Sequence, residues 1–392
     1  PAWKAYEWAS RTLRKRGKAG GGSRRRPIKV SQLTRLRRAI WAIPELGIYT
    51  VPLPNRRFLE ARRKRIQTLA ERGIVARLHS DGPFEPIAKL EMAFGASATR
   101  PPSLLALGDS VFYRVSRTDR DQTSLGGMLE DRFPAQALAI AGSAFHPRVY
   151  LALLRVLAKL PHHPRKLVLP VNMRCFSPQW GLRPDYAYTR EIAAAEAHRA
   201  GDPAPETRFP SPSEREEALA RMLDTPVSFP DSPLSSFGAF AELVAASPSG
   251  REAKAWRERQ IAIFHYLYPL EPDHPWLIDL KACIALAGEL GIRPLVYITP
   301  VNRDWGAKAA PDIFAARFAA NVETCLGVLA PDVQAAHGCL LDWSRAFGAG
   351  EFFNPDEKTE HLCEQGRRRL VGMIADELSQ MDAAKAVDAA PA

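Results

Sequence analysis

A short apolar stretch that ends in Gly-Asp-Ser constrains the fold of this chain more than any other feature. Residues 103–107 are mostly apolar, two prolines precede them, and Gly108, Asp109 and Ser110 follow. An apolar run of this length between Pro and Gly is typical of a buried β-strand. Gly108 permits a sharp turn, so Ser110 should emerge at the carboxyl edge of the sheet, where ligands bind open α/β folds. The plainer interpretation is a turn, or a helix N-cap made by Asp109 or Ser110.

The rest of the pattern predicts a parallel sheet. Further strands are expected at 136–141, 166–171, 293–299 and 338–342, and helices near 122–132, 146–160, 276–291, 311–329 and 363–381. Short, almost wholly apolar strands that alternate with helices are typical of a parallel sheet covered on both faces. The predicted fold is therefore α/β, a flavodoxin-like three-layer α/β/α arrangement with a five-stranded parallel sheet.

The remaining segments divide the chain. Residues 101–180 and 276–382 are expected to form the α/β domain, and 383–392 a disordered tail. Residues 181–275 are too many for a loop, and they contain Pro-rich and charged patches between helical runs at 186–200, 213–223 and 251–268. We expect a mostly helical insertion that caps the carboxyl edge of the sheet. Residues 1–100 are expected to form a basic, partly flexible helical N-terminal segment.

The positive charge of the chain is concentrated in residues 1–80, which hold 21 Lys and Arg against 4 Asp and Glu. Since the whole chain carries +11, residues 81–392 carry a net charge of −6. Basic helices are expected at 31–48 and 56–76, and they could dock on an anionic membrane surface or an acidic protein. They could equally pack on the main domain with their arginines in water. Nucleic acid is the least favoured partner, because no nucleic-acid-binding motif is present.

Cysteine usage and hydropathy bear on the class of protein. The five cysteines are widely scattered without a Cys-x-x-Cys pair, which argues against a disulfide framework and a zinc site and fits a reducing compartment. No run of about 18 apolar residues is present, and the first residues lack the apolar core of a secretion signal. We therefore expect a cytoplasmic protein, free or peripheral at a membrane, without a metal or cofactor.

Four residues able to carry chemistry lie either directly after an expected strand or in the loop before the last helix. Ser110 follows the first expected strand, Gly142 the second and Asn172 the third, while His361 precedes the last helix. Carboxyl ends of parallel strands meet at one edge, so these four residues should converge there. Each also has a plainer interpretation: a turn glycine, an asparagine that caps its own backbone, or a histidine at a helix entry.

In these four blocks the chain resembles the SGNH (GDSL) hydrolase superfamily, with weaker similarity to DltD-like and polysaccharide O-acyl transfer branches. The likeness covers residues 103–175 and 293–380. It implies Ser110 as the nucleophile and His361 as the base that removes its proton. It also implies an oxyanion hole formed by the backbone N–H groups of Ser110 and Gly142 with the side chain of Asn172.

The acid that orients the histidine departs from the family pattern. The family places it three residues before the histidine, where this chain has Lys358. Asp356, Glu357 and Glu360 are the available carboxylates. We expect Asp356 to fill this role, since the loop can fold it back toward the ring while Glu360, adjacent to His361, tends to point away. A weakened triad, a Ser–His dyad and an inactive member stay open.

These observations favour a serine-dependent ester hydrolase that forms an acyl-enzyme on an O-acyl or thioester substrate. The acyl group could be carried by a small molecule, a carbohydrate or a carrier. An O-acyltransferase is the related alternative, because both activities share the first half-reaction. A non-catalytic protein of the same fold, docking an acidic partner or a membrane surface through residues 1–80, is the alternative from another class.

Overall fold

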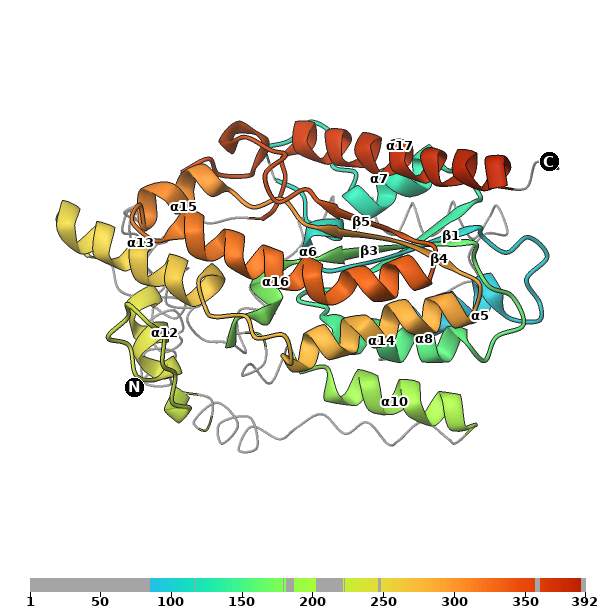
Figure 1. The fold of residues 1–392 in the computed structure, drawn as a ribbon, viewed down its shortest axis with the longest axis horizontal. Coiled ribbons are helices and arrows are strands. Elements are labelled where there is room, and N and C mark those ends of the chain that lie inside the picture. The colour runs from blue at the N-terminus through green and yellow to red at the C-terminus, as the bar shows by residue number, and fades with distance from the viewer. Residues whose placement is uncertain are drawn as a thin grey trace, which may run out of the picture.

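A five-stranded, all-parallel sheet lies at the centre of the computed structural model (Figure 1). The structure describes residues 85–116, 118–178, 180, 187–201, 221, 223–245, 248–356 and 360–388. The strands are β1 (Leu104–Gly108), β2 (Ala137–Ala141), β3 (Lys166–Val171), β4 (Arg293–Ile298) and β5 (Cys339–Asp342). Their starts and ends lie within about one residue of those expected from the apolar runs, so the predicted strands are confirmed.

The strand order determines where a site can form. The order is β2-β1-β3-β4-β5, so the chain adds β2 on one side of β1 and then crosses to place β3 on the other. The neighbours β1 and β3 therefore send their following loops to opposite sides, which opens a crevice at their carboxyl ends. This order is the flavodoxin-like one. The predicted three-layer α/β/α fold is confirmed.

Alternation along the strands divides the core into two layers. Leu105 and Leu107 of β1 pack in one cluster, and Leu104 and Ala106 pack in the other, because successive strand residues point to opposite faces. The first layer contains the helices α5 (Glu85–Phe94), α8 (Pro147–Leu157), α14 (Pro275–Glu289) and α16 (Phe314–Ala335). The second contains α7 (Leu125–Arg132) and α17 (Glu364–Asp388), which lie above the sheet in Figure 1.

Two helices extend past the expected boundaries of the α/β domain. Helix α5 falls within the expected N-terminal segment, yet its Leu90 and Phe94 are fully buried against α8 and the sheet. At the other end, residues 383–388 continue α17, where a disordered tail was expected. This stretch is rich in alanine, the residue with the highest helix propensity. The expected basic helices at 31–48 and 56–76 lie outside the described residues.

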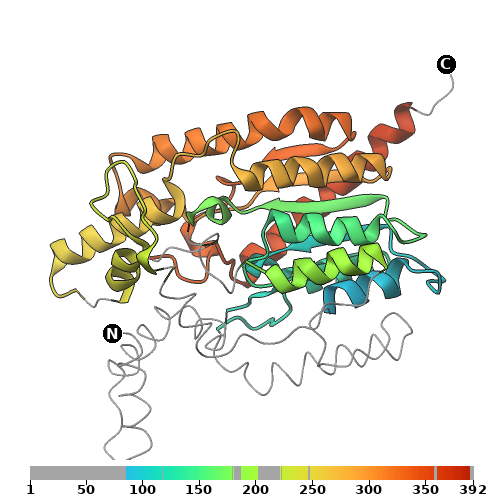
Figure 2. The same ribbon diagram turned by 90° about the horizontal axis from the view of Figure 1, so that it is seen from below.

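The expected insertion divides into two parts. Helix α10 (Thr189–Ala200) packs along α8, away from the carboxyl edge (Figure 2). The small side chains of Ala194 and Ala195 are buried and allow the helix to approach closely. Helices α12 (Phe237–Ala245) and α13 (Arg251–Tyr266) lie at the carboxyl end of the strands (Figure 1). Most of the expected helix at 213–223 falls outside the described residues. In the part of the chain that the structure describes, no helix is long and apolar enough to cross a membrane.

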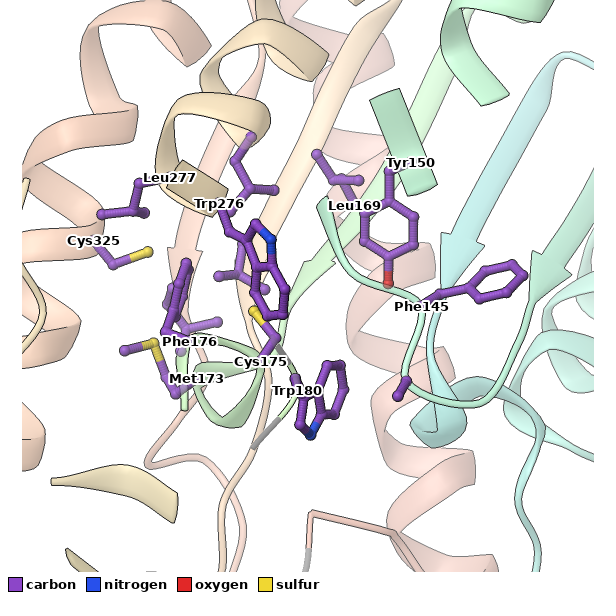
Figure 3. Packing of buried hydrophobic residues seen from close by; sticks show 14 of the residues in the cluster. Phe145, Tyr150, Leu169, Met173, Cys175, Phe176, Trp180, Trp276, Leu277 and Cys325 are labelled. Atoms are coloured by element: carbon purple, nitrogen blue, oxygen red, sulfur yellow. The ribbon is translucent and has the colours of Figure 1, made fainter. Parts of the chain in front are cut away.

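The segment that follows β3 is fixed by a dense apolar cluster (Figure 3). Met173, Cys175 and Phe176 of the short 3-10 helix η1 (Met173–Phe176) are each at most 3% exposed. They pack with Trp276 and Leu277 of α14. Asn172, the residue directly before η1, is thereby held at the edge of the sheet by the burial of its successors.

A buried arginine joins the loop after α6 (Ser110–Tyr113) to the start of α17. Arg367 is 0% exposed and pairs with Asp119 at 2.6 Å. Its guanidinium also donates to the backbone oxygens of Thr123 (3.2 Å), Asp121 (2.8 Å) and Leu362 (3.1 Å). Since Leu362 adjoins His361, these bonds tie the histidine loop to the helical layer.

Replacing Arg367 should destabilise the fold far more than replacing its neighbour. Arg367→Met leaves Asp119, whose side chain is 8% exposed, without its cation, so we expect the free energy of unfolding to fall by about 3–5 kcal/mol. Arg368→Met is the matched control: Arg368 is 58% exposed and pairs with Asp121 and Glu364 at the surface, where a loss below about 1 kcal/mol is expected. Urea denaturation measures both, and equal losses would contradict a structural role for Arg367.

Candidate active site

Ser110 lies directly beyond the carboxyl end of β1. Asp109 is the N-cap of α6 and Ser110 its first residue. The Asp109 side chain accepts a hydrogen bond from the Val111 N–H at 2.8 Å. A side chain at Gly108 would come within 2.3 Å of the Phe112 ring, so glycine allows this tight turn. The structure therefore contains the N-cap of the plainer interpretation, and the same cap presents Ser110 at the sheet edge.

His361 approaches from the opposite end of the chain, in the loop before α17. Its carbonyl accepts from the Phe353 N–H at 3.0 Å, and the next residue, Leu362, bridges to Phe352. The imidazole Nε2 lies 2.9 Å from Ser110 Oγ, across 251 residues of sequence. Both residues are buried, Ser110 at 7% and His361 at 8% exposure. The structure thus brings together the two residues expected to be nucleophile and base.

Burial keeps the His361 ring neutral. Desolvation lowers its pKa from 6.5 to about 3; Glu360 opposes this shift, while the charges of Arg114 and Arg174 add to it. In the neutral tautomer that carries hydrogen on Nδ1, Nε2 accepts from a serine hydroxyl. A neutral base facing a hydroxyl is the ground state that proton transfer requires.

Asn172 also lies at this edge, where its side chain already has partners. Its Nδ2 donates to Asp109 Oδ2 at 2.6 Å, and its Oδ1 accepts from the Arg174 N–H at 3.1 Å. A primary amide carries two hydrogens on nitrogen, so one is used by Asp109. The expected oxyanion donor therefore also links the block that contains Ser110 to the end of β3.

The expectation for Gly142 is not met in this conformation. Its N–H donates to the carbonyl of Gly108 at 3.2 Å, which extends the β1–β2 ladder by one residue and occupies this donor. A side chain at this position would come within 2.2 Å of the Phe145 ring. Close packing against Phe145 therefore accounts for the glycine here.

Asp356 is not the acid that orients His361, which corrects the expectation. Its side chain is 92% exposed and pairs with Lys308 at 3.8 Å. The neighbouring backbone is held outward because Asn302 Nδ2 donates to the carbonyl of Pro355 at 2.8 Å. Lys308 lies on α15 (Arg303–Ala309), which begins after Asn302. Glu357 and Lys358 lie outside the described residues.

Glu360, the carboxylate next to His361 in sequence, enters a buried network. Its carboxylate is 1% exposed, pairs with Arg174 at 2.9 Å and accepts from the Tyr266 hydroxyl at 3.0 Å. Although burial opposes ionisation, Arg174, His361 and Tyr266 together lower the pKa of Glu360 to about 2. Neither Arg174 nor Tyr266 was expected in the site. Helical spacing marks Tyr266 only as a core residue.

Asp109 shows the opposite electrostatic behaviour. Burial raises its pKa to about 6, although hydrogen bonds from Asn172 and the Val111 N–H partly offset the rise. Amide donors stabilise a carboxylate less than a paired guanidinium does, so two buried carboxyls of one site have shifts of opposite sign.

No protein-family model matches the chain, and the curated proteins searched contain no match to it. Among the described residues, no group of His, Cys, Asp and Glu is arranged to hold a metal ion. The geometry of Ser110, His361 and their neighbours is therefore the basis for a functional assignment.

The opposite pKa shifts of Asp109 and His361 predict how stability depends on pH. The raised pKa of Asp109 contributes stability that is lost as the pH rises from 3.8 to about 6. The lowered pKa of His361 contributes stability that is lost as the pH falls from 6.5 to about 3. Between pH 4.5 and 6 the two slopes oppose each other. Glu360 is ionised in the folded state over this whole range, and its remaining titration in the unfolded state, near pH 4.5, is common to the unsubstituted protein and to the variants below.

Removing one of the two titratable groups should reveal the pH dependence of stability that the other produces. As the pH rises from 4.5 to 6, the unfolding free energy of Asp109→Asn should increase by about 2 kcal/mol relative to that of the unsubstituted protein. Over the same range, the unfolding free energy of His361→Gln should decrease by about 2 kcal/mol relative to that of the unsubstituted protein. Urea denaturation at pH 4.5, 5, 5.5 and 6 gives these slopes. Identical slopes in all three proteins would show that neither group has the assigned pKa.

Proposed function

We propose that the protein is a serine-dependent ester hydrolase of the SGNH type that acts through an acyl-enzyme on an O-acyl or thioester substrate. One observation carries the proposal: the 2.9 Å contact between Ser110 Oγ and His361 Nε2 at the carboxyl edge of a parallel sheet. The order of Ser110, Gly142, Asn172 and His361 along the chain, and the flavodoxin-like sheet, support membership of that superfamily.

The reaction follows from the pair. As Ser110 Oγ attacks the acyl carbonyl, His361 Nε2 takes the hydroxyl proton, and the carbonyl oxygen becomes an oxyanion. Collapse of this intermediate expels the alcohol or thiol, which receives the proton from the imidazolium. Water then attacks the acyl-Ser110 ester, with His361 again as the base, and releases the acid.

Two donors are proposed for the oxyanion. The Ser110 N–H starts α6, where backbone donors have no acceptor within their own helix, and the second Nδ2 hydrogen of Asn172 is the other. Gly142 is left out because its N–H is bonded to Gly108. Loss of one such donor typically raises the barrier by about 3–4 kcal/mol.

An O-acyltransferase is the second candidate, and the burial of both reacting groups favours it. With Ser110 and His361 each less than a tenth exposed, an acceptor hydroxyl that fills the site would exclude water. Partition of the acyl-enzyme between water and an added alcohol distinguishes the two candidates. The proposed substrates are an acylated small molecule, a carbohydrate or a carrier-bound acyl group.

Replacement of Ser110 should abolish ester cleavage. With p-nitrophenyl acetate as the substrate, we expect Ser110→Ala to lower kcat/KM by at least about 1000-fold, because the nucleophile is lost. His361→Gln should lower it to a similar extent, since residues that act as one unit are not additive.

The control is Asp356→Asn, which removes the exposed carboxylate that pairs with Lys308. Its kcat/KM should equal that of the unsubstituted protein. Equal background rates in the unsubstituted and Ser110→Ala proteins would favour the non-catalytic binding protein.

We also propose that residues 1–80 dock the protein on an acidic protein or an anionic membrane surface, supported by their excess of 17 positive charges. Deleting them should weaken co-sedimentation with anionic lipid vesicles at low salt, a difference that high salt removes. Turnover of p-nitrophenyl acetate should persist. Undiminished binding after the deletion would contradict the membrane role.

A further inference from the structure

The side-chain amide of Asn172 lies between two neighbours that accept only one orientation of it. Its Oδ1 is 3.1 Å from the backbone nitrogen of Arg174, and its Nδ2 is 2.6 Å from Asp109 Oδ2. A backbone N–H can only donate a hydrogen bond, and an ionised carboxylate can only accept one. A reversed amide would place nitrogen against nitrogen at Arg174 and oxygen against oxygen at Asp109. The two partners therefore determine which end of the amide is which.

The same two contacts fix the direction of the second Nδ2 hydrogen. An amide group is planar, so this hydrogen has one direction once Oδ1 and the first N–H are placed. It is the hydrogen proposed above for the oxyanion. If the amide were reversed, its oxygen would take the place of this donor and repel the oxyanion. The orientation of one amide thus decides whether Asn172 stabilises or destabilises the transition state.

The backbone of Asn172 cannot make that choice. Its carbonyl accepts from the Cys175 N–H at 2.8 Å, and Cys175 is held in the buried cluster around η1 (Figure 3). These contacts fix the position of the residue, but the last torsion of an asparagine side chain has a broad, roughly two-fold preference. The hydrogen-bond partners of the amide must therefore select its orientation.

Asp109 is well placed to select it. Asp109 is 1% exposed and Asn172 4%, so their bond is shielded from water, where a charge-assisted bond is strong. The other carboxylate oxygen of Asp109, Oδ1, accepts from the Val111 N–H at 2.8 Å and caps α6, the helix that begins with Ser110. One carboxylate thus joins the element that presents the serine to the amide of Asn172.

We propose that Asp109 is a positioning residue for ester cleavage: it holds the Asn172 amide with its nitrogen toward the oxyanion. Its role is exerted through Asn172 and not through contact with the reacting atoms. The inference rests on the proposed serine-dependent activity and on the assignment of Asn172 to the oxyanion hole.

The first test is Asp109→Asn at pH 8, where Asp109, with its pKa of about 6, is ionised in the unsubstituted protein. The introduced amide keeps an oxygen for the Val111 N–H, so the helix cap survives, but it sets a donor against Asn172 Nδ2. Reversal of the Asn172 amide would relieve this clash and create another at Arg174. We expect kcat for p-nitrophenyl acetate to fall on the order of 10- to 100-fold, with KM within about threefold, because the oxyanion exists only beyond the ground state.

The second test exchanges the two side chains in the double variant Asp109→Asn/Asn172→Asp. The introduced amide can donate to the introduced carboxylate, which also accepts the Arg174 N–H, so the network is restored without a donor for the oxyanion. Its urea midpoint should exceed that of Asn172→Asp, in which two buried carboxylates face each other. Its kcat should stay at least about 100-fold below that of the unsubstituted protein. A purely structural role for Asp109 predicts that activity returns with stability.

The matched control is Asp342→Asn, which changes another carboxylate at the carboxyl end of a strand, where Asp342 accepts from the Ser344 N–H at 2.9 Å. Its kcat should be unchanged. Full kcat in Asp109→Asn, or a double variant that regains both stability and activity, would overturn the inference while the serine mechanism stands. If Asp109→Asn does not fold, the double variant decides. Equal rates in the unsubstituted and Ser110→Ala proteins would overturn both proposals.

Discussion

The hydrogen bond between Ser110 and His361 depends on nearly every feature of the fold. The serine emerges from the first strand and the histidine from the loop before the last helix, so the whole domain lies between them in sequence. Parallel strands place both at one edge, and the strand order opens a crevice there between β1 and β3. A change that shifts either the cap of α6 or the entry of α17 would separate the two groups.

Burial determines the electrostatics of the site. Within one edge of the sheet, His361 is held neutral, Asp109 has a pKa of about 6 and Glu360 one of about 2. The difference between the two carboxyls follows from their partners, since Asp109 has amide donors and Glu360 has a guanidinium and a phenol. A base, a weak acid and a permanent anion thus coexist without a metal ligand set among the described residues.

The strands and the central pair could be predicted because their signals are local. Apolar runs between Pro and Gly give the strands, and the position after each run gives Ser110 and Asn172. The direction of the loop that contains Asp356 could not be predicted, because a contact with Asn302, 53 residues away, sets it. Likewise, the partners of Glu360 lie 186 and 94 residues away in sequence. The Gly142 N–H depends on the register of β1 and β2, which no local pattern contains.

The most direct measurement is the mapping of a fluorophosphonate adduct by tandem mass spectrometry. A hydroxyl activated by a neutral imidazole attacks the phosphorus, so the folded protein should carry one phosphonyl group, on the peptide that contains Ser110. The His361→Gln protein should stay unlabelled under the same conditions. A folded protein that takes up no label, or takes it up equally well without His361, would contradict a working pair.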